Sequence, residues 1–189
     1  MLTQNSMLET LKDFVQRLDD LGIQYMITGS FAMHAYATGR LTYDIDVILD
    51  VSRWDAERFE SRFLPDYYVD QIMISNAIER SSMFNVLNLA NGVKVDCIIR
   101  KATAFEAEKF GRRRKSEIDE ISFWVISKED LILSKLEWAK DSLSEKQFLD
   151  IRNLVESGLD EELFQQQIGR LNLADVWKEF EKWKIRVEK

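Results

Sequence analysis

The spacing of apolar residues along the chain predicts a series of alternating helices and strands. Over residues 6–21 apolar side chains recur at helical spacing. Ser6 and Glu9 have capping-box spacing there, and Gly22 lies where the helix should end. Short apolar or alternating runs, bounded by glycine or polar residues, predict strands. Further along, the pattern predicts strands over 23–28 and 42–50, a helix over 31–38, a helix over 54–63 before Pro65, and weak helical character over 72–80.

The pattern changes character near residue 127. Before it, residues 84–100 alternate on both sides of Ala-Asn-Gly and predict a hairpin, and residues 121–126 predict one more strand. Ser127 and Asp130 then have capping spacing. The helices expected from here on begin at 127 and cover 144–157, 160–170 and 174–187. The predicted fold class is α+β, with a mixed sheet flanked by helices in a core over 1–126 and a helical region over 127–189.

Composition narrows the classes of function. The chain has 189 residues, of which 46% are hydrophobic, and its net charge of -7 argues against binding nucleic acid over its whole surface. The residues at the N-terminus lack the pattern of a secretion signal, and no apolar run is long enough to cross a membrane. A single cysteine, Cys97, suits a cytoplasmic location. With only one histidine, His34, any metal would be bound mainly by carboxylates, which favours Mg²⁺ or Mn²⁺.

Two acids stand in an otherwise apolar strand pattern, DIDVIL. Because side chains alternate along a strand, Asp44 and Asp46 share one face. Two neighbouring carboxylates repel each other, so the pair indicates either a strand face open to solvent or a bound cation. A third acid, Asp96, interrupts the apolar run VKVDCII in the same way.

Gly29 and Ser30 lie between a predicted strand and a predicted helix. Backbone N–H groups at such a turn can bind an anion, although the same pattern is also typical of a simple helix N-cap. A phosphate-binding turn together with three strand acids is what metal-dependent phosphoryl or nucleotidyl transfer requires.

These residues resemble a known signature. Gly29-Ser30, thirteen intervening residues and then Asp44-Ile45-Asp46-Val47 resemble the motif of the nucleotidyltransferase superfamily with the DNA polymerase β-like fold. Asp96 matches the third carboxylate of that superfamily, and Thr28 departs from the apolar residue usual before the glycine. The stretches 80–99 and 125–154 are similar to small bacterial nucleotidyltransferase-like proteins related to the toxins of type IV toxin–antitoxin systems. The likeness covers roughly residues 22 to 155.

The resemblance implies roles for individual residues. Asp44 and Asp46 would hold the metal ions, Asp96 would be a further ligand or a general base, and Gly29-Ser30 would bind the β- and γ-phosphates of a nucleoside triphosphate such as ATP. In the toxin relatives a lysine and an aspartate also line the active site, and Lys135 and Asp150 match them. From the pattern alone, Lys135 is equally consistent with a surface lysine whose stem lies along apolar neighbours.

Basic residues offer further candidates, each with a plain alternative. Arg40 could neutralise phosphate in the same cleft or be an ordinary surface arginine. The run Arg112-Arg113-Arg114-Lys115 could guide a nucleic-acid acceptor or be a solvated loop. His34, in the predicted helix after Ser30, is expected to be structural.

The function expected from the sequence is Mg²⁺-dependent transfer of a nucleoside monophosphate from a triphosphate to an acceptor hydroxyl, with release of pyrophosphate. The acceptor stays open between tRNA, a protein side chain and a small molecule. The alternatives are a nucleotide-binding regulatory module without catalysis, and a toxin held by an antitoxin partner.

Overall fold

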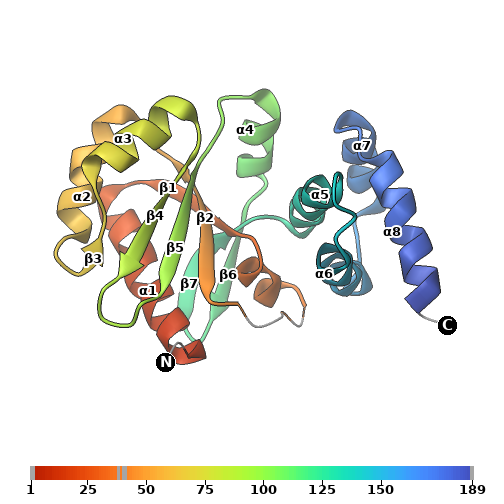
Figure 1. Ribbon diagram of the computed structural model, residues 1–189, viewed down its shortest axis with the longest axis horizontal. Helices are drawn as coiled ribbons and strands as arrows, with labels where there is room; N and C mark the ends of the chain where they lie inside the picture. The colour runs from red at the N-terminus through yellow and green to blue at the C-terminus, as the bar shows by residue number, and fades with distance from the viewer. Residues whose placement is uncertain (1–2, 38, 40–41, 188–189) are drawn as a thin grey trace. The chain divides into compact units, whose positions relative to one another are not determined.

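The computed structural model describes residues 3–37, 39 and 42–187, and the chain divides into two compact units. Unit 1 comprises residues 1–31 and 41–126 and contains the β-sheet, whereas unit 2 comprises residues 32–40 and 127–189 and is helical (Figure 1). The predicted fold class, a mixed sheet flanked by helices and followed by helices, is confirmed. Residues 32–40, which the sequence pattern places with the first region, group with unit 2.

Seven strands of the described chain form one mixed sheet in the order β3-β4-β5-β2-β1-β7-β6. The central strand β2 pairs antiparallel with β1 and parallel with β5. The hairpin predicted over 84–100 is confirmed as the antiparallel pair of β4 and β5. The bounds are β1 Gln24–Thr28, β2 Asp44–Asp50, β3 Tyr67–Tyr68, β4 Met83–Asn88, β5 Lys94–Ile99, β6 Arg114–Ile118 and β7 Ile121–Val125.

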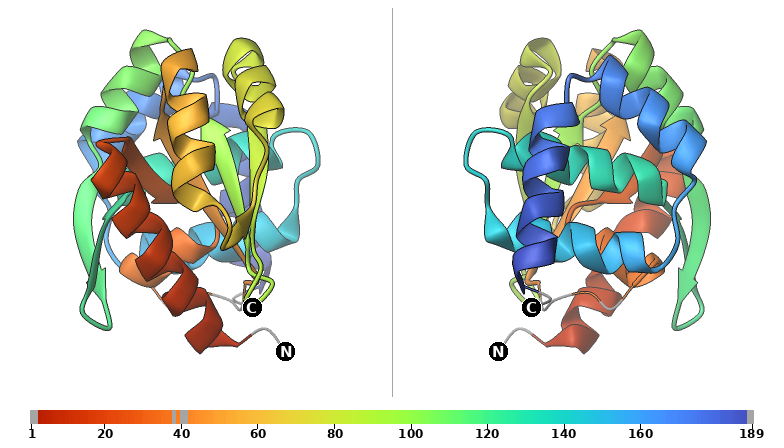
Figure 2. Two further views of the ribbon diagram at one scale, coloured as in Figure 1. Left: turned by 90° about the vertical axis from the view of Figure 1, so that its left-hand side faces the viewer. Right: turned by 90° about the vertical axis from the view of Figure 1, so that its right-hand side faces the viewer.

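The register gives the sheet one apolar face and one face with acids. Side chains alternate along each strand, so the pairing of Val47 with Cys97 places the buried residues of β2 and β5 together. On this face Phe84 of β4 contacts the ring of Phe59, with ring centroids 5.4 Å apart. Figure 2 (left) shows the helices α1 (Gln4–Leu21) and α2 (Ala56–Phe63) in front of the strands. The acids therefore lie on the opposite face of β2 and β5.

Helix α1 differs from its prediction at one end only. Its N-cap is Thr3, whose side chain accepts a hydrogen bond from the backbone N–H of Ser6, so the capping box predicted at Ser6 and Glu9 is wrong. At the other end, Gly22 adopts a left-handed conformation (φ 70°) and ends the helix as predicted.

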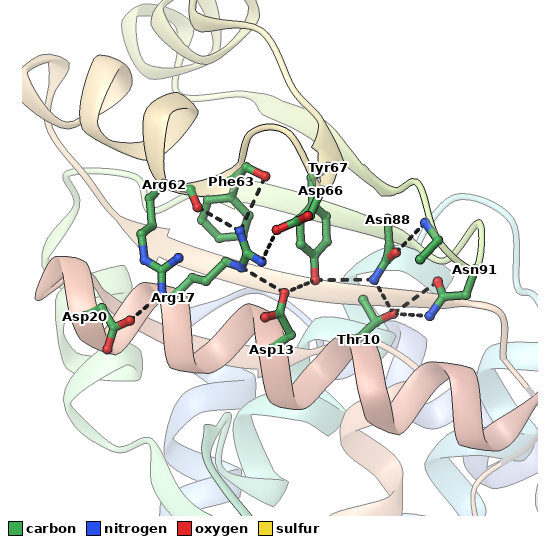
Figure 3. A network of polar contacts seen from close by, with 11 residues as sticks. Thr10, Asp13, Arg17, Asp20, Arg62, Phe63, Asp66, Tyr67, Asn88 and Asn91 are labelled. Atoms are coloured by element: carbon green, nitrogen blue, oxygen red, sulfur yellow. Dashed lines mark hydrogen bonds and ion pairs between the residues drawn. The ribbon is translucent and has the colours of Figure 1, made fainter.

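A polar network joins α1 to the C-terminal end of α2 and to the segment that follows it (Figure 3). Arg17 donates to the carbonyl oxygen of Arg62 at 2.8 Å and pairs with Asp66 at 2.6 Å. Asp13 accepts hydrogen bonds from Arg17 and from the Tyr67 hydroxyl. These contacts satisfy polar groups at the rim of an aromatic cluster, in which Phe14 meets Phe59, Phe63 and Tyr67. The network fixes α1 against the β3 edge of the sheet.

Several elements before residue 127 are shorter than predicted or absent from the prediction. The helix expected over 31–38 is a 3₁₀ helix, η1 (Phe31–Ala35), and the helix over 54–63 begins with a 3₁₀ turn, η2 (Arg53–Asp55). Helix α3 (Gln71–Arg80) confirms the weak helical pattern over 72–80. The sequence pattern missed the helix α4 (Ala104–Gly111) and the strands β3 and β6.

Unit 2 is built around an aromatic core. Its helices are α5 Lys128–Ala139, α6 Glu145–Glu156, α7 Glu161–Arg170 and α8 Ala174–Val187, close to the predicted bounds. Phe148 of α6 packs against Phe180 and Trp183 of α8, with ring centroids 5.8 and 5.7 Å apart. Within the described part of the chain, no helix is both long enough and apolar enough to span a membrane.

Candidate active site on the acidic face of the sheet

Three acids of unit 1 lie on the same face of two adjacent strands. Asp46 on β2 pairs in parallel register with Asp96 on β5, and Asp44 is two residues before Asp46 on the same face. Asp44 and Asp46 are half-buried, whereas Asp96 is only 6% exposed. The sheet therefore brings together three carboxylates from positions more than forty residues apart in the sequence.

Gly29 lies directly against Asp46. Strand β1 pairs Thr28 with Asp46, and Gly29 follows with a left-handed φ of 63°. A Cβ at this position would lie 2.6 Å from Cγ of Asp46 and closer still to its Oδ2. Only a residue without a side chain fits here in that conformation. The turn Gly29-Ser30 and the carboxylate of Asp46 thus form one continuous surface.

The turn after β1 does not lead into an α-helix. Ser30 is buried, and the next residues form the five-residue 3₁₀ helix η1. The predicted helix after the turn is therefore a short 3₁₀ helix. The anion site stays a prediction, which the backbone N–H groups of Gly29 and Ser30 would carry.

A lysine that the motif search overlooked neutralises part of this face. The ammonium of Lys94 donates to Oδ2 of Asp96 at 2.7 Å, and Lys94 pairs in register with Asp44. The hydrogen bond to Asp96, together with the charges of Asp96, Asp44 and Asp46, raises the pKa of Lys94 despite partial burial. Alternation along VKVD is the signal that could have found it, because residues 94 and 96 must share a face.

Carboxylates are suitable ligands for a divalent cation, but these three are not arranged around a common point where a cation could bind. Among residues 3–37, 39 and 42–187, no three carboxylate, imidazole or thiol side chains are arranged to hold a metal ion. Asp44 instead accepts a hydrogen bond from the Thr42 hydroxyl at 2.6 Å. Oδ1 of Asp96, however, is buried and accepts no hydrogen bond from any described group. A buried carboxylate oxygen that lacks a partner beside two more acids fits a hard cation such as Mg²⁺.

Solved structures of other proteins share this architecture. The lincosamide antibiotic adenylyltransferase LnuA, in its lincomycin-bound structure, matches with a TM-score of 0.53 and 13% identity over 81% of this chain and 96% of its own. The antibiotic-resistance factor ANT(2'')-Ia matches with a TM-score of 0.54 and 14% identity over 98% and 97%. The chain has the nucleotidyltransferase fold. The resemblance inferred from the motif is confirmed at the level of the fold.

A third structure also matches most of the chain. JHP933 from Helicobacter pylori matches with a TM-score of 0.55 and 19% identity over 96% of this chain and 76% of its own. No protein-family model matches the sequence, and no curated protein matches it closely enough to count as a relative. At these identities the likeness is evidence for the nucleotidyltransferase fold alone.

Unit 2 of this nucleotidyltransferase fold holds the other two predicted site residues, and it pairs them. The ammonium of Lys135 on α5 donates to Oδ2 of Asp150 on α6 at 2.6 Å. Their side chains are 5% and 2% exposed. The alternative of Lys135 as a surface lysine is therefore wrong. A buried ion pair holds its two helices in one register, because separating the charges would leave each of them desolvated.

Removal of one partner of the pair between Lys135 and Asp150 should destabilise the protein. We expect Lys135→Met to lower the free energy of unfolding by about 3 kcal/mol, because the desolvated carboxylate of Asp150 loses the ammonium. The double variant Lys135→Met/Asp150→Leu should recover most of that loss. Urea unfolding measures both. The matched control is Lys182→Met, which breaks an exposed pair with Glu179 at 2.7 Å and should change stability by less than about 1 kcal/mol. An equal loss of stability in Lys135→Met and Lys182→Met would contradict this account.

Three further residues singled out in the sequence are Arg40, His34 and Cys97. Arg40 lies outside the described residues, and His34 lies in η1. Cys97 is buried on the apolar face, where burial raises the pKa of its thiol well above the ordinary value and makes it unreactive.

The run Arg112-Arg113-Arg114-Lys115 is not a loop, as one of its two interpretations assumed. Arg112 caps α4, and Arg114 begins the edge strand β6. The guanidinium of Arg113 lies between two rings, 4.4 Å from the centroid of Phe110 and 4.7 Å from that of Trp124. Burial lowers the pKa of Arg113. At least one of these charges therefore has a packing role.

Proposed function

We propose that this protein is a Mg²⁺- or Mn²⁺-dependent nucleotidyltransferase that moves a nucleoside monophosphate from a triphosphate to an acceptor hydroxyl. The observation that carries the proposal is the parallel register of Asp46 and Asp96, with Gly29 packed directly against Asp46. This places three acids and a close backbone approach on one face of a sheet with the nucleotidyltransferase fold.

Each residue of the face has a role in this proposal. Asp44, Asp46 and Asp96 would hold the divalent cation, which supplies charge neutralisation at the phosphates when bound. The backbone of Gly29 and Ser30 would bind the β- and γ-phosphates, since no side chain at residue 29 stands between phosphate and backbone. Asp96, the most buried of the three acids, would be the further ligand or the general base that accepts the proton of the attacking hydroxyl.

Lys135 and Asp150 complete the proposal in unit 2. The resemblance to toxin nucleotidyltransferases assigns both residues to an active site, and their short contact fixes the position of the lysine ammonium. By the same resemblance, Lys135 would act on the triphosphate and Asp150 would orient the lysine ammonium.

For the acceptor we favour a small molecule that carries positive charge. The negative charge of the face and of the whole chain favours a cationic small molecule over a nucleic acid. LnuA, one of the proteins with this fold, is a lincosamide antibiotic adenylyltransferase, which supports a small-molecule acceptor. A protein hydroxyl and the end of a tRNA stay within the proposal.

The test is transfer of label from triphosphates that carry ³²P in the α-phosphate. Wild-type protein and Mg²⁺ are incubated in separate reactions with total RNA, with a mixture of proteins, and with aminoglycosides and lincosamides. Label should become attached to one acceptor class, and EDTA should abolish the transfer. Absence of transfer to every class, at Mn²⁺ as well as Mg²⁺, would sink the proposal.

A second candidate, a nucleotide-binding module without catalysis, is favoured by one observation. Lys94 pairs with Asp96, so the face is partly neutralised by the protein's own cation. This version expects calorimetry to detect triphosphate binding of equal strength with and without Mg²⁺, and no turnover. Binding that strengthens with Mg²⁺ would reject it.

The resemblance to toxins of type IV toxin–antitoxin systems gives a narrower version of the enzyme proposal. In it, transfer arrests growth, and an antitoxin partner relieves the arrest. Induced expression should then be toxic for the wild type and harmless for an Asp46→Asn variant. Growth at the same rate in both cultures would remove the toxin role and leave the transferase proposal intact.

A further inference from the structure

The ammonium of Lys94 contacts Asp96, one of the three acids that are proposed to bind a divalent cation. Its ammonium lies 2.7 Å from Oδ2 of Asp96, and its backbone pairs with that of Asp44 on the neighbouring strand. Residues 94 and 96 are two apart on β5, so both side chains project from the acidic face. The chain itself therefore supplies a positive charge to this acidic face.

The two partners of this contact differ in their freedom to move. The Lys94 side chain is 43% exposed, whereas that of Asp96 is 9% exposed. A lysine side chain has four rotatable bonds and a strongly hydrated ammonium, so it can turn into water at little cost. The Asp96 carboxylate is fixed within the sheet, and its Oδ1 lacks a hydrogen bond from any described group. The contact can be opened by moving the lysine alone.

We infer that Lys94 is a built-in counter-ion of the acidic face, which a divalent cation must displace from Asp96 before the site is complete. This inference rests on the metal site of the proposed function. Without a divalent cation, Lys94 relieves the repulsion among Asp44, Asp46 and Asp96. When a divalent cation binds, it takes over that role with more charge, and the ammonium leaves Oδ2 of Asp96. Lys94 is thus a positioning residue, which sets the concentration of divalent cation that is needed to fill the site.

Mn²⁺ binding to the purified full chain, followed by the EPR signal of free Mn²⁺, tests this inference without any assay of activity. Lys94→Met keeps the length of the side chain and removes its charge. We expect the Mn²⁺ dissociation constant to fall about tenfold in this variant, because the competing ammonium is gone. Lys94→Arg keeps the charge and should bind Mn²⁺ like the wild type. Lys12→Met makes the same charge change on the exposed side of α1 and should also bind like the wild type.

Thermal unfolding provides the second readout. Lys94→Met should unfold at a lower temperature than the wild type in EDTA and should gain more stability from added Mn²⁺. A lysine with only a structural role would show the first change without tighter Mn²⁺ binding, and that result would overturn the inference.

The outcomes separate the inference from the proposed function. Equal or weaker Mn²⁺ binding by Lys94→Met, with measurable binding by the wild type, overturns the counter-ion role and leaves the metal site standing. No Mn²⁺ binding by the wild type or by any variant overturns the metal site itself, and the inference with it.

Discussion

Asp46→Asn should reduce nucleotidyl transfer by about 10³-fold or more while leaving the fold intact. The amide has the size of the carboxylate, so the packing against Gly29 is preserved, but a charged ligand for the cation and its phosphate is lost. The measurement is the rate of label transfer from an α-labelled triphosphate at saturating Mg²⁺. Thermal unfolding of the same sample checks that the variant is folded.

The matched control for this variant lies on the same strand. Asp50 ends β2 and forms an ion pair with Arg100 at 2.8 Å, away from the register pair of Asp46 and Asp96. Asp50→Asn makes the same chemical change and should keep transfer within about threefold of the wild type. If both variants lost activity equally, the loss would reflect charge on the strand rather than a site at Asp46.

Gly29→Ala should be among the most destabilising single substitutions in unit 1, at about 4 kcal/mol. Two effects add. The new Cβ would overlap with the Asp46 side chain, and the backbone has a left-handed φ of 63° that alanine adopts with strain. Nucleotidyl transfer should fall as well, because relief of the overlap requires Asp46 to move. Urea unfolding and the transfer assay measure the two consequences.

Gly22→Ala measures the cost of the left-handed backbone without the overlap of a new Cβ with another side chain. Gly22 has a similar left-handed φ of 70°, but nothing lies within 4 Å of the position of a new Cβ. This variant should lose only about 1 kcal/mol of stability and keep its activity. In the background of Asp46→Ala, which removes two of the three overlapping atoms, Gly29→Ala should cost about 2 kcal/mol less than it does alone. A cost that is the same in both backgrounds would contradict the contact between Gly29 and Asp46.

The elements with a strong local pattern were predictable, and those defined by distant partners were not. The helices α6 to α8 and the β4–β5 hairpin show their spacing and turn residues in the sequence itself. The region of α4 and β6 was obscured by its positive charges. Arg113 is accommodated there because Trp124, contributed by β7, stacks on its guanidinium. Such a partner cannot be read from the residues around Arg113.

The candidate site was predictable in its chemistry but not in its contacts. Alternation alone places Asp44 and Asp46 on one face, and it also places Lys94 beside Asp96. The adjacency of Asp46 and Asp96, however, depends on parallel pairing of β2 and β5, which no local pattern specifies. The contact of Gly29 with Asp46 likewise depends on the antiparallel register of β1 and β2. The burial of Lys135 against Asp150 requires two helices that pack together.

The fate of each phosphate of the triphosphate tests the central claim most directly. Parallel reactions contain the wild-type protein, Mg²⁺, the acceptor fraction and a triphosphate labelled with ³²P in either the α- or the γ-phosphate. Nucleotidyl transfer predicts that α-label becomes bound to the acceptor and that γ-label leaves as pyrophosphate, with both signals absent from Asp46→Asn. Attachment of γ-label to the acceptor, or α-label transfer that persists in Asp46→Asn, would contradict the account.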